Sequence, residues 1–156
     1  MPMTATATAP LSRSRLVTCA AALRRFPLSV LQLLFRLAIA GVFLRAGLNK
    51  LASWELTVQL FRDEYKVPAL PAEVAATMAT CVEIGCSVLL IAGLATRVAT
   101  LPMLGMLAVI QLFVYPSAWS EHLVWGSILL FLLTRGGGTF SLDHAIGLEP
   151  PVDGER

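Results

Sequence analysis

Charged residues are scarce in this sequence, and the residues that usually hold metals or electrons are scarcer still. Of its 156 residues only 14% are Asp, Glu, Lys or Arg, and there are two histidines and three cysteines. The cysteines form no CxxC and the histidines no ligand spacing, so neither a metal site nor a haem site is expected. No Walker or dinucleotide-binding glycine pattern occurs. A net charge of +2, spread along the chain, argues against nucleic-acid binding.

Long apolar stretches are what the sequence has instead, since 56% of its residues are hydrophobic. About 20 mainly apolar residues cross roughly 30 Å of hydrocarbon. Four stretches approach that length, at 26–44, 74–94, 98–116 and 117–134, and the last is short and opens on the polar run "SAWSEHL". Backbone in lipid must close its own hydrogen bonds, and short connections make successive helices neighbours. The sequence therefore predicts an all-α membrane protein, an antiparallel bundle of four transmembrane helices.

The segments that flank the apolar region differ from it in composition. Residues 1–25 are rich in small polar residues and predict a flexible N-terminal segment, residues 26–143 form the membrane domain, and 144–156 form a loose tail. Basic residues gather on one side of the predicted membrane: Arg13, Arg15, Arg24, Arg25, Arg97 and Arg135. By the positive-inside rule, both termini are expected in the cytoplasm.

The connection between the first two spans is the longest, from about residue 48 to 73. Trp54, Val58, Phe61 and Tyr65 recur in it at helical spacing, with charged residues between them. This pattern predicts an amphipathic helix in the outer membrane interface, ended by the prolines of "VPALP".

Two opposite charges fall near the centres of the first two predicted spans. Arg36 and Glu83 are each expected at mid-depth, where an isolated charge costs about 2.5–3.5 kcal/mol on insertion scales. The two side chains are therefore predicted to face inward and to pair with each other. Gly47 and Lys50 fall on the same helix face as Arg36, and Gly47 is expected to let a neighbouring helix approach closely.

A second polar cluster is predicted at the outer end of the bundle. Lys50 and Glu121 are expected there at the same level, and four further residues can join them: Asn49, Gln111, Tyr115 and His122. At the cytoplasmic rim, Ser141 is expected to cap a short helix, and Arg97 to pair with Asp143. A structural interpretation stands beside the functional one, since membrane ion pairs also fix helix register and rim charges are often only solvated. A lone histidine such as His122 is seldom a metal site.

Four sequence stretches resemble the DoxX family of small four-helix membrane proteins: "RLAIAGVFLRAGLNKL", "VPALP", "EIGCSVLLIAGLATRVATL" and "GGGTFSLD". The resemblance implies a location in the bacterial cytoplasmic (inner) membrane. It also implies a role like that of its relatives, which are described as quinone-reducing subunits in thiosulfate oxidation or as partners of thiol and superoxide defence proteins. Carried over by position, the family pattern falls on Arg36, Gly41, Gly47, Lys50, Glu83, Gly93, Arg97, Gly138, Ser141 and Asp143. Two features depart from the family pattern, Arg45 at the end of the first span and "GGGTF" after the fourth. The second departure implies a less rigid connection after the fourth span.

Two functional hypotheses follow from these features. In the first, the chain is a redox-linked membrane subunit whose polar site, formed by Arg36, Glu83, Lys50 and Glu121, binds a quinone headgroup or passes protons to it. It would then need an electron-donating partner protein, because it has no cofactor motif of its own. In the second, it is a non-catalytic scaffold or assembly factor, and the charges only lock the bundle. A solute carrier is a weaker third idea, because four helices without an inverted repeat leave little room for alternating access unless the chain forms a homo-oligomer.

Overall fold

The computed structural model describes residues 26–148, and these form helices and connecting turns without a strand. Four long elements make the bundle: α2 (Leu28–Ala52), α4 (Ala72–Ala92), α5 (Thr96–Val109) continued by the π-helical turn η2 (Ile110–Val114), and α6 (Trp119–Arg135). The all-α prediction is confirmed. The predicted N-terminal segment 1–25, and the tail from residue 149 on, lie outside the described residues.

Three of these helices are long and apolar enough to cross a membrane, within the part of the chain that the structure describes: Leu28–Ala52, Ala72–Ala92 and Thr96–Val114. The first is longer than predicted, because it continues past the apolar stretch to Ala52. The fourth helix, α6, has 17 residues and is therefore about 26 Å long, slightly less than a full hydrocarbon thickness.

The helices pack as two pairs around one apolar core. α2 lies most closely against α4, and α5 against α6. Phe35 of α2 meets Phe131 of α6 edge to face, with ring centroids 5.2 Å apart. A Cβ on Gly47 of α2 would lie 2.6 Å from the side chain of Ile84 on α4, so the absence of a side chain allows the predicted close approach of these two helices.

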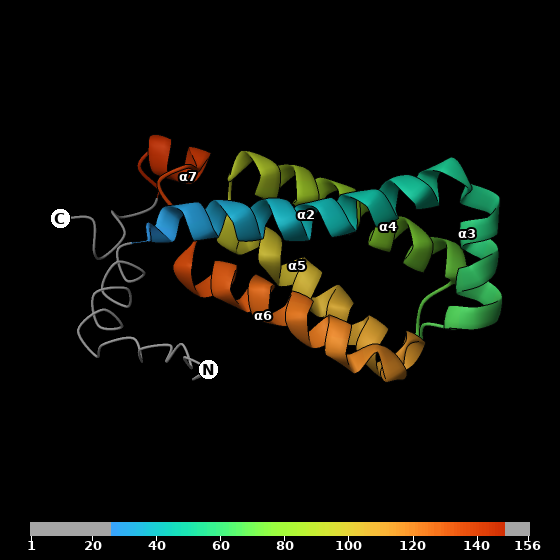
Figure 1. The fold of residues 1–156 in the computed structure, drawn as a ribbon. Coiled ribbons are helices and arrows are strands. Elements are labelled where there is room, and N and C mark those ends of the chain that lie inside the picture. The colour runs from blue at the N-terminus through green and yellow to red at the C-terminus, as the bar shows by residue number, and fades with distance from the viewer. Residues whose placement is uncertain (1–25, 149–156) are drawn as a thin grey trace, which may run out of the picture.

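A short helical segment closes one end of the bundle. It consists of α3 (Trp54–Leu60) and the π-helical turn η1 (Phe61–Tyr65), and Figure 1 shows it at the end opposite to the small C-terminal helix α7 (Leu142–Ala145). Its apolar residues pack inward, since Phe61 is buried against Ala75 and Ala76 of α4, with Trp54 beside them. The predicted amphipathic pattern is confirmed. The segment ends at Lys66, which has a φ of 43°.

The opposite end of the bundle is built from side chains that bond to main-chain groups. The guanidinium of Arg36 donates to the carbonyls of Leu90 and Ile91 at the end of α4, at 2.8 and 2.9 Å. It also donates to the carbonyls of Gly137 and Phe140 in the glycine-rich connection. The last carbonyls of a helix have no intrahelical partners. Arg36 of α2 therefore caps the end of α4, and it also holds the glycine-rich connection through hydrogen bonds to its carbonyls.

Two more residues of this end act in the same way. Ser141 accepts a hydrogen bond from the His144 amide and caps α7, as predicted. The carboxylate of Asp143 accepts hydrogen bonds from the amides of Ala95 and Thr96, at 2.6 and 2.8 Å, and caps the start of α5. The predicted ion pair between Asp143 and Arg97 does not form in the part of the chain that the structure describes; the Asp143 carboxylate instead accepts from amides that have no helical acceptor of their own.

Candidate functional site: a charged pair in an apolar cavity

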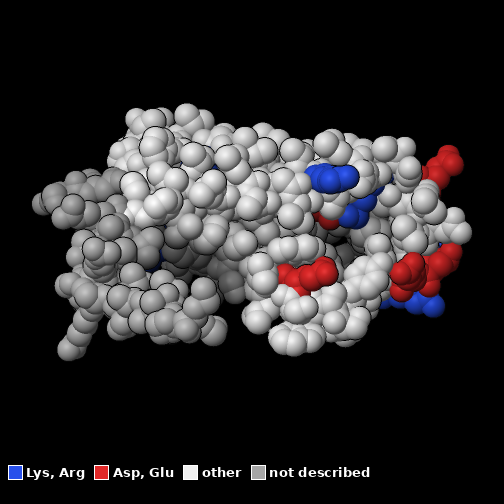
Figure 2. Space-filling view, viewed as in Figure 1, with Lys and Arg blue, Asp and Glu red and all other residues white. Residues whose placement is uncertain are grey.

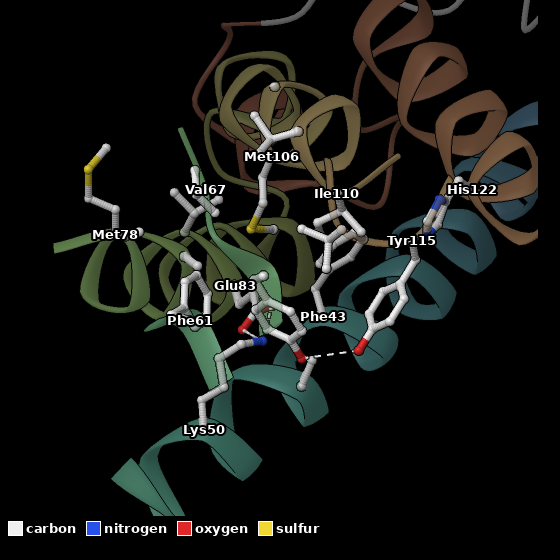
Figure 3. A pocket seen from close by; sticks show the side chains of 18 of the residues that line it. Phe43, Lys50, Phe61, Val67, Met78, Glu83, Met106, Ile110, Tyr115 and His122 are labelled. Carbon is white, nitrogen blue, oxygen red and sulfur yellow. Dashed lines mark hydrogen bonds and ion pairs between the residues drawn. The ribbon is translucent and has the colours of Figure 1, made fainter. Parts of the chain in front are cut away.

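A cavity of about 590 Å³ lies at the α3 end of the bundle, between α2, α4, α5 and α6 and below η1 (Figure 3). Most of its wall is apolar and is formed by side chains from every long helix, such as Phe43, Val82, Met106 and Trp125. Its polar lining residues are few: Lys50, Tyr65, Glu83, Tyr115, Glu121 and His122. Cavities of this size that combine apolar walls with a few polar groups are typical of small-molecule sites.

The central polar feature of the cavity is an ion pair between α2 and α4. Lys50 Nζ lies 2.6 and 2.8 Å from the two carboxylate oxygens of Glu83, and Figure 3 shows the ammonium turned toward the carboxylate. The Glu83 side chain is only 3% exposed, whereas that of Lys50 is 20% exposed. Gly47, one turn before Lys50, brings the two helices together here, because a Cβ on it would lie 3.0 Å from the Cβ of Glu83.

The predicted pairing of Arg36 with Glu83 is therefore wrong, and the reason is depth. Arg36 bonds to the carbonyl of Leu90, which lies seven residues, or about 10 Å, beyond Glu83 along α4. Because α2 and α4 are antiparallel, the residue of α2 that faces Glu83 lies further along α2, at Lys50. The prediction assumed that the first span was centred on Arg36. In the structure α2 extends to Ala52, so Arg36 lies in the half of α2 nearer the glycine-rich connection.

Two tyrosines, from elements far apart in the sequence, meet at the rim of the cavity. The hydroxyl of Tyr115, directly after η2, lies 3.4 Å from that of Tyr65 in η1 and 3.2 Å from a carboxylate oxygen of Glu64. The hydrogen bond with Tyr65 is the main cause that raises the pKa of Tyr115 above the ordinary tyrosine value, followed by burial and the charge of Glu64. Tyr115 therefore remains a neutral phenol near neutral pH.

A histidine from α6 forms part of the cavity wall. His122 is 7% exposed, and its Nδ1 lies 2.7 Å from the amide oxygen of Gln111 in η2. Its ring also lies against Trp125, with centroids 5.6 Å apart. Gln111 does not line the cavity itself but holds His122 from behind.

A smaller cavity of about 380 Å³ lies on the other side of Lys50. It shares Ala46, Lys50, Phe61 and Tyr65 with the large cavity and is otherwise lined by more polar residues, among them Asn49, Ser53 and Thr57. Lys50 therefore lies between an apolar chamber and a polar recess beside α3.

A sequence model of the DoxX family matches residues 31–116, which is more than half of the chain. The chain belongs to the DoxX family. No curated protein and no solved structure matches it significantly. The matched range includes the ion pair and Tyr115, whereas His122 and Glu121 lie beyond it. As a DoxX protein with long apolar helices, the chain is a multi-pass membrane protein.

The structure divides the predicted site residues of this DoxX protein between its two ends. Lys50, Glu121, Tyr115 and His122 line the large cavity together with Glu83, so four of the six residues that the sequence groups at one end lie around it. Asn49 is exposed and lines only the smaller cavity. The remaining predicted residues lie at the α7 end, away from both cavities: Arg36, Arg97, Ser141 and Asp143.

Sequence reasoning missed the part that η1 plays in the DoxX site. Tyr65 and Phe61 line both cavities, but in the sequence they appear only as the last members of an amphipathic stripe. The sequence did contain a signal for Tyr65. A leucine at this position would pack equally well, so the hydroxyl of a tyrosine at the polar edge of the stripe points to a polar contact. Among residues 26–148, no group of three His, Cys, Asp or Glu side chains is placed to hold a metal ion.

One face of the molecule shows how its charges are distributed (Figure 2). Figure 2 shows that the charged side chains visible on this face gather mostly toward the α3 end, whereas the rest of the face is largely uncharged. Such a surface suits a bundle whose apolar sides contact lipid and whose α3 end reaches the polar interface.

Proposed function

We propose that this DoxX protein is a redox-linked subunit of the bacterial cytoplasmic membrane that binds a quinone headgroup in the large cavity. The observation that carries the proposal is the Lys50–Glu83 pair within an otherwise apolar chamber of about 590 Å³. A quinone headgroup is a flat apolar ring with two carbonyl acceptors, and its prenyl tail is apolar. The chamber offers matching groups, because apolar walls can take the ring while a charged donor reaches a carbonyl.

Lys50 is the donor that this proposal assigns to the quinone. An ammonium has three N–H groups, and Glu83 accepts from Lys50 at two oxygens, which leaves one N–H for a ligand. Glu83 holds the ammonium in place, so that it is already oriented before a ligand arrives. Tyr115 and Tyr65 lie at the rim, where they can contact the substituents of the ring.

The setting of the cavity in the membrane follows from the distribution of arginines. With both termini in the cytoplasm, α6 forms the fourth span and the α3 end, with its cavity, lies at the outer face of the membrane. The sequence carries no dinucleotide fingerprint and no cysteine pair. Electrons therefore come from a partner protein, and this chain supplies the quinone site.

Binding of a soluble quinone analogue to the purified full-length protein in lipid nanodiscs tests the proposal. Decylubiquinone or a short-chain menaquinone should quench tryptophan fluorescence saturably, because Trp125 lines the cavity. Lys50→Met should weaken binding about tenfold, as expected when a charged donor to a ligand is lost. Arg45→Met is the matched control, since Arg45 is an exposed cation on the same helix and lines neither cavity. Linear, unsaturable quenching, or equal affinity of the Lys50→Met variant, would refute the proposal.

A scaffold or assembly role is the second candidate, and the α7 end favours it. There the polar side chains of Arg36, Ser141 and Asp143 bond to main-chain groups and so serve the fold. If Lys50 and Glu83 also serve only the fold, exchanging them as Lys50→Glu with Glu83→Lys should retain both folding and the association with any partner. A quinone site should instead lose its ligand while the bundle stays folded.

A further inference from the structure

The hydrogen bonds around His122 determine which ring nitrogen carries the proton. The amide nitrogen of Gln111 donates to the carbonyl oxygen of Pro116 at 2.9 Å, and a carbonyl can only accept. The amide oxygen of Gln111 therefore faces His122, at 2.7 Å from Nδ1. Because that oxygen is also only an acceptor, the proton between them belongs to Nδ1. In the neutral ring, Nε2 is left with a bare lone pair.

This lone pair belongs to a buried side chain in the wall of the large cavity. His122 is 7% exposed and lines the chamber, whereas Gln111, which occupies the Nδ1 side, does not line it. No hydrogen-bond partner of Nε2 occurs among residues 26–148, and the other contact of the ring is with the ring of Trp125. Nε2 is not among the described side-chain atoms that are both fully buried and without a partner, so it stays reachable from the cavity that His122 lines. A ligand that brings a hydrogen-bond donor can therefore bind to it there.

We propose that the cavity recognises the reduced, hydroquinone form of its ligand, through a hydroxyl that donates to Nε2 of His122. The choice of a quinone-type ring rests on the proposed function. An oxidised quinone carries only acceptors and would place one opposite the lone pair of Nε2. A hydroquinone presents a hydroxyl to Nε2, and its other oxygen can still accept from Lys50. The Lys50 side of the cavity therefore accepts both forms, and His122 distinguishes them.

The test compares a short-chain ubiquinol analogue with its dimethyl ether, which has the same ring but no donor. Binding to the full-length protein in nanodiscs is measured under anaerobic conditions by tryptophan quenching. The wild type should prefer the hydroquinone by about tenfold. His122→Phe should abolish this preference and leave the affinity for the ether unchanged. Gln111→Leu, which removes the acceptor facing Nδ1, should reduce the preference.

The oxidised analogue separates this inference from the proposed function. If it binds saturably and through Lys50, but the hydroquinone and its ether bind equally, the quinone site stands and the role of His122 is wrong. A preference that survives in His122→Phe overturns the inference in the same way. If no form of the ring binds, the proposed function and the inference both fail.

A second measurement examines the tautomer without any ligand. The chain has two histidines, so in His144→Gln the only imidazole signals come from His122. In ¹⁵N NMR spectra of the neutral ring, Nδ1 should show the shift of a protonated nitrogen and Nε2 that of a bare one. The reverse assignment would overturn the inference whatever the cavity binds.

Discussion

The two members of the Lys50–Glu83 pair differ in their access to water, so removing either one should have a different cost. Glu83 is 3% exposed in the middle of α4, whereas Lys50 is 20% exposed and also lines the polar recess beside α3. Lys50→Met leaves a buried carboxylate without its partner, which should destabilise the fold by about 3–5 kcal/mol. Glu83→Gln leaves an ammonium that can turn toward the recess, so the loss should be about 1–3 kcal/mol.

Equilibrium unfolding in mixed micelles, followed by circular dichroism, measures these differences. The double variant with methionine at both positions should recover most of the stability lost in Lys50→Met, because replacing a whole buried pair by apolar residues is close to neutral. Arg45→Met controls for the loss of a cation on the same helix. Equal losses in the two single variants, or a double variant that loses the sum of both, would refute the reasoning from unequal burial.

Three further predictions concern the packing, the polar end and the rim. Gly47→Ala should lower the free energy of unfolding by about 1–3 kcal/mol, because the new Cβ would lie 2.6 Å from a side chain of α4. Gly41→Ala is the control in the same unfolding assay and should be tolerated, because a Cβ there would have nothing within 4 Å. Arg36→Lys should cost about 1–3 kcal/mol through lost hydrogen bonds to carbonyls, yet leave quinone affinity unchanged in the fluorescence assay. Because the pKa of Tyr115 is raised, its hydrogen bond with Tyr65 stabilises the fold below the ordinary tyrosine pKa, and this stabilisation is lost as the pH rises through the raised value. In Tyr65→Phe, ultraviolet titration of tyrosinate should show Tyr115 ionising at a lower pH than in the wild type.

The cavity end of the protein was the part that sequence reasoning approached best. Helical periodicity gives the face of each residue, and position within an apolar stretch gives an approximate level in the bundle. Those two coordinates were enough to group Lys50, Glu121, His122 and Tyr115, which the structure places around one cavity. They also gave the close approach at Gly47.

The partner of Arg36 could not be found in this way, for a physical reason. Its hydrogen bonds go to main-chain carbonyls of Leu90 and of the glycine-rich connection, and any residue type presents a carbonyl. Periodicity carries no information about them. The connection also passes through positive φ at Gly136 and Gly138, and a Cβ on Gly138 would meet the side chain of Gln32. Glycines of this kind show that a close contact exists but not which side chain makes it.

The charged residues of the two ends differ in what they bond to. At the α7 end, Asp143 has both oxygens on amides and Arg36 makes four bonds to carbonyls, so each compensates a helix end that would otherwise be unsatisfied. At the α3 end, Lys50 keeps one N–H beyond its bonds to Glu83, and Nε2 of His122 has no partner among the described residues. Three buried polar atoms outside the cavity also lack a partner among the described residues, namely Gln32 Oε1, Ser87 Oγ and Thr96 Oγ1, so a missing partner does not by itself mark a ligand site. Lys50 and His122 differ from them because both line the cavity. The position of Lys50 and His122 in the cavity supports the proposal that a molecule enters it and completes their hydrogen bonds, whereas Arg36 and Asp143 hold the opposite end of the bundle together.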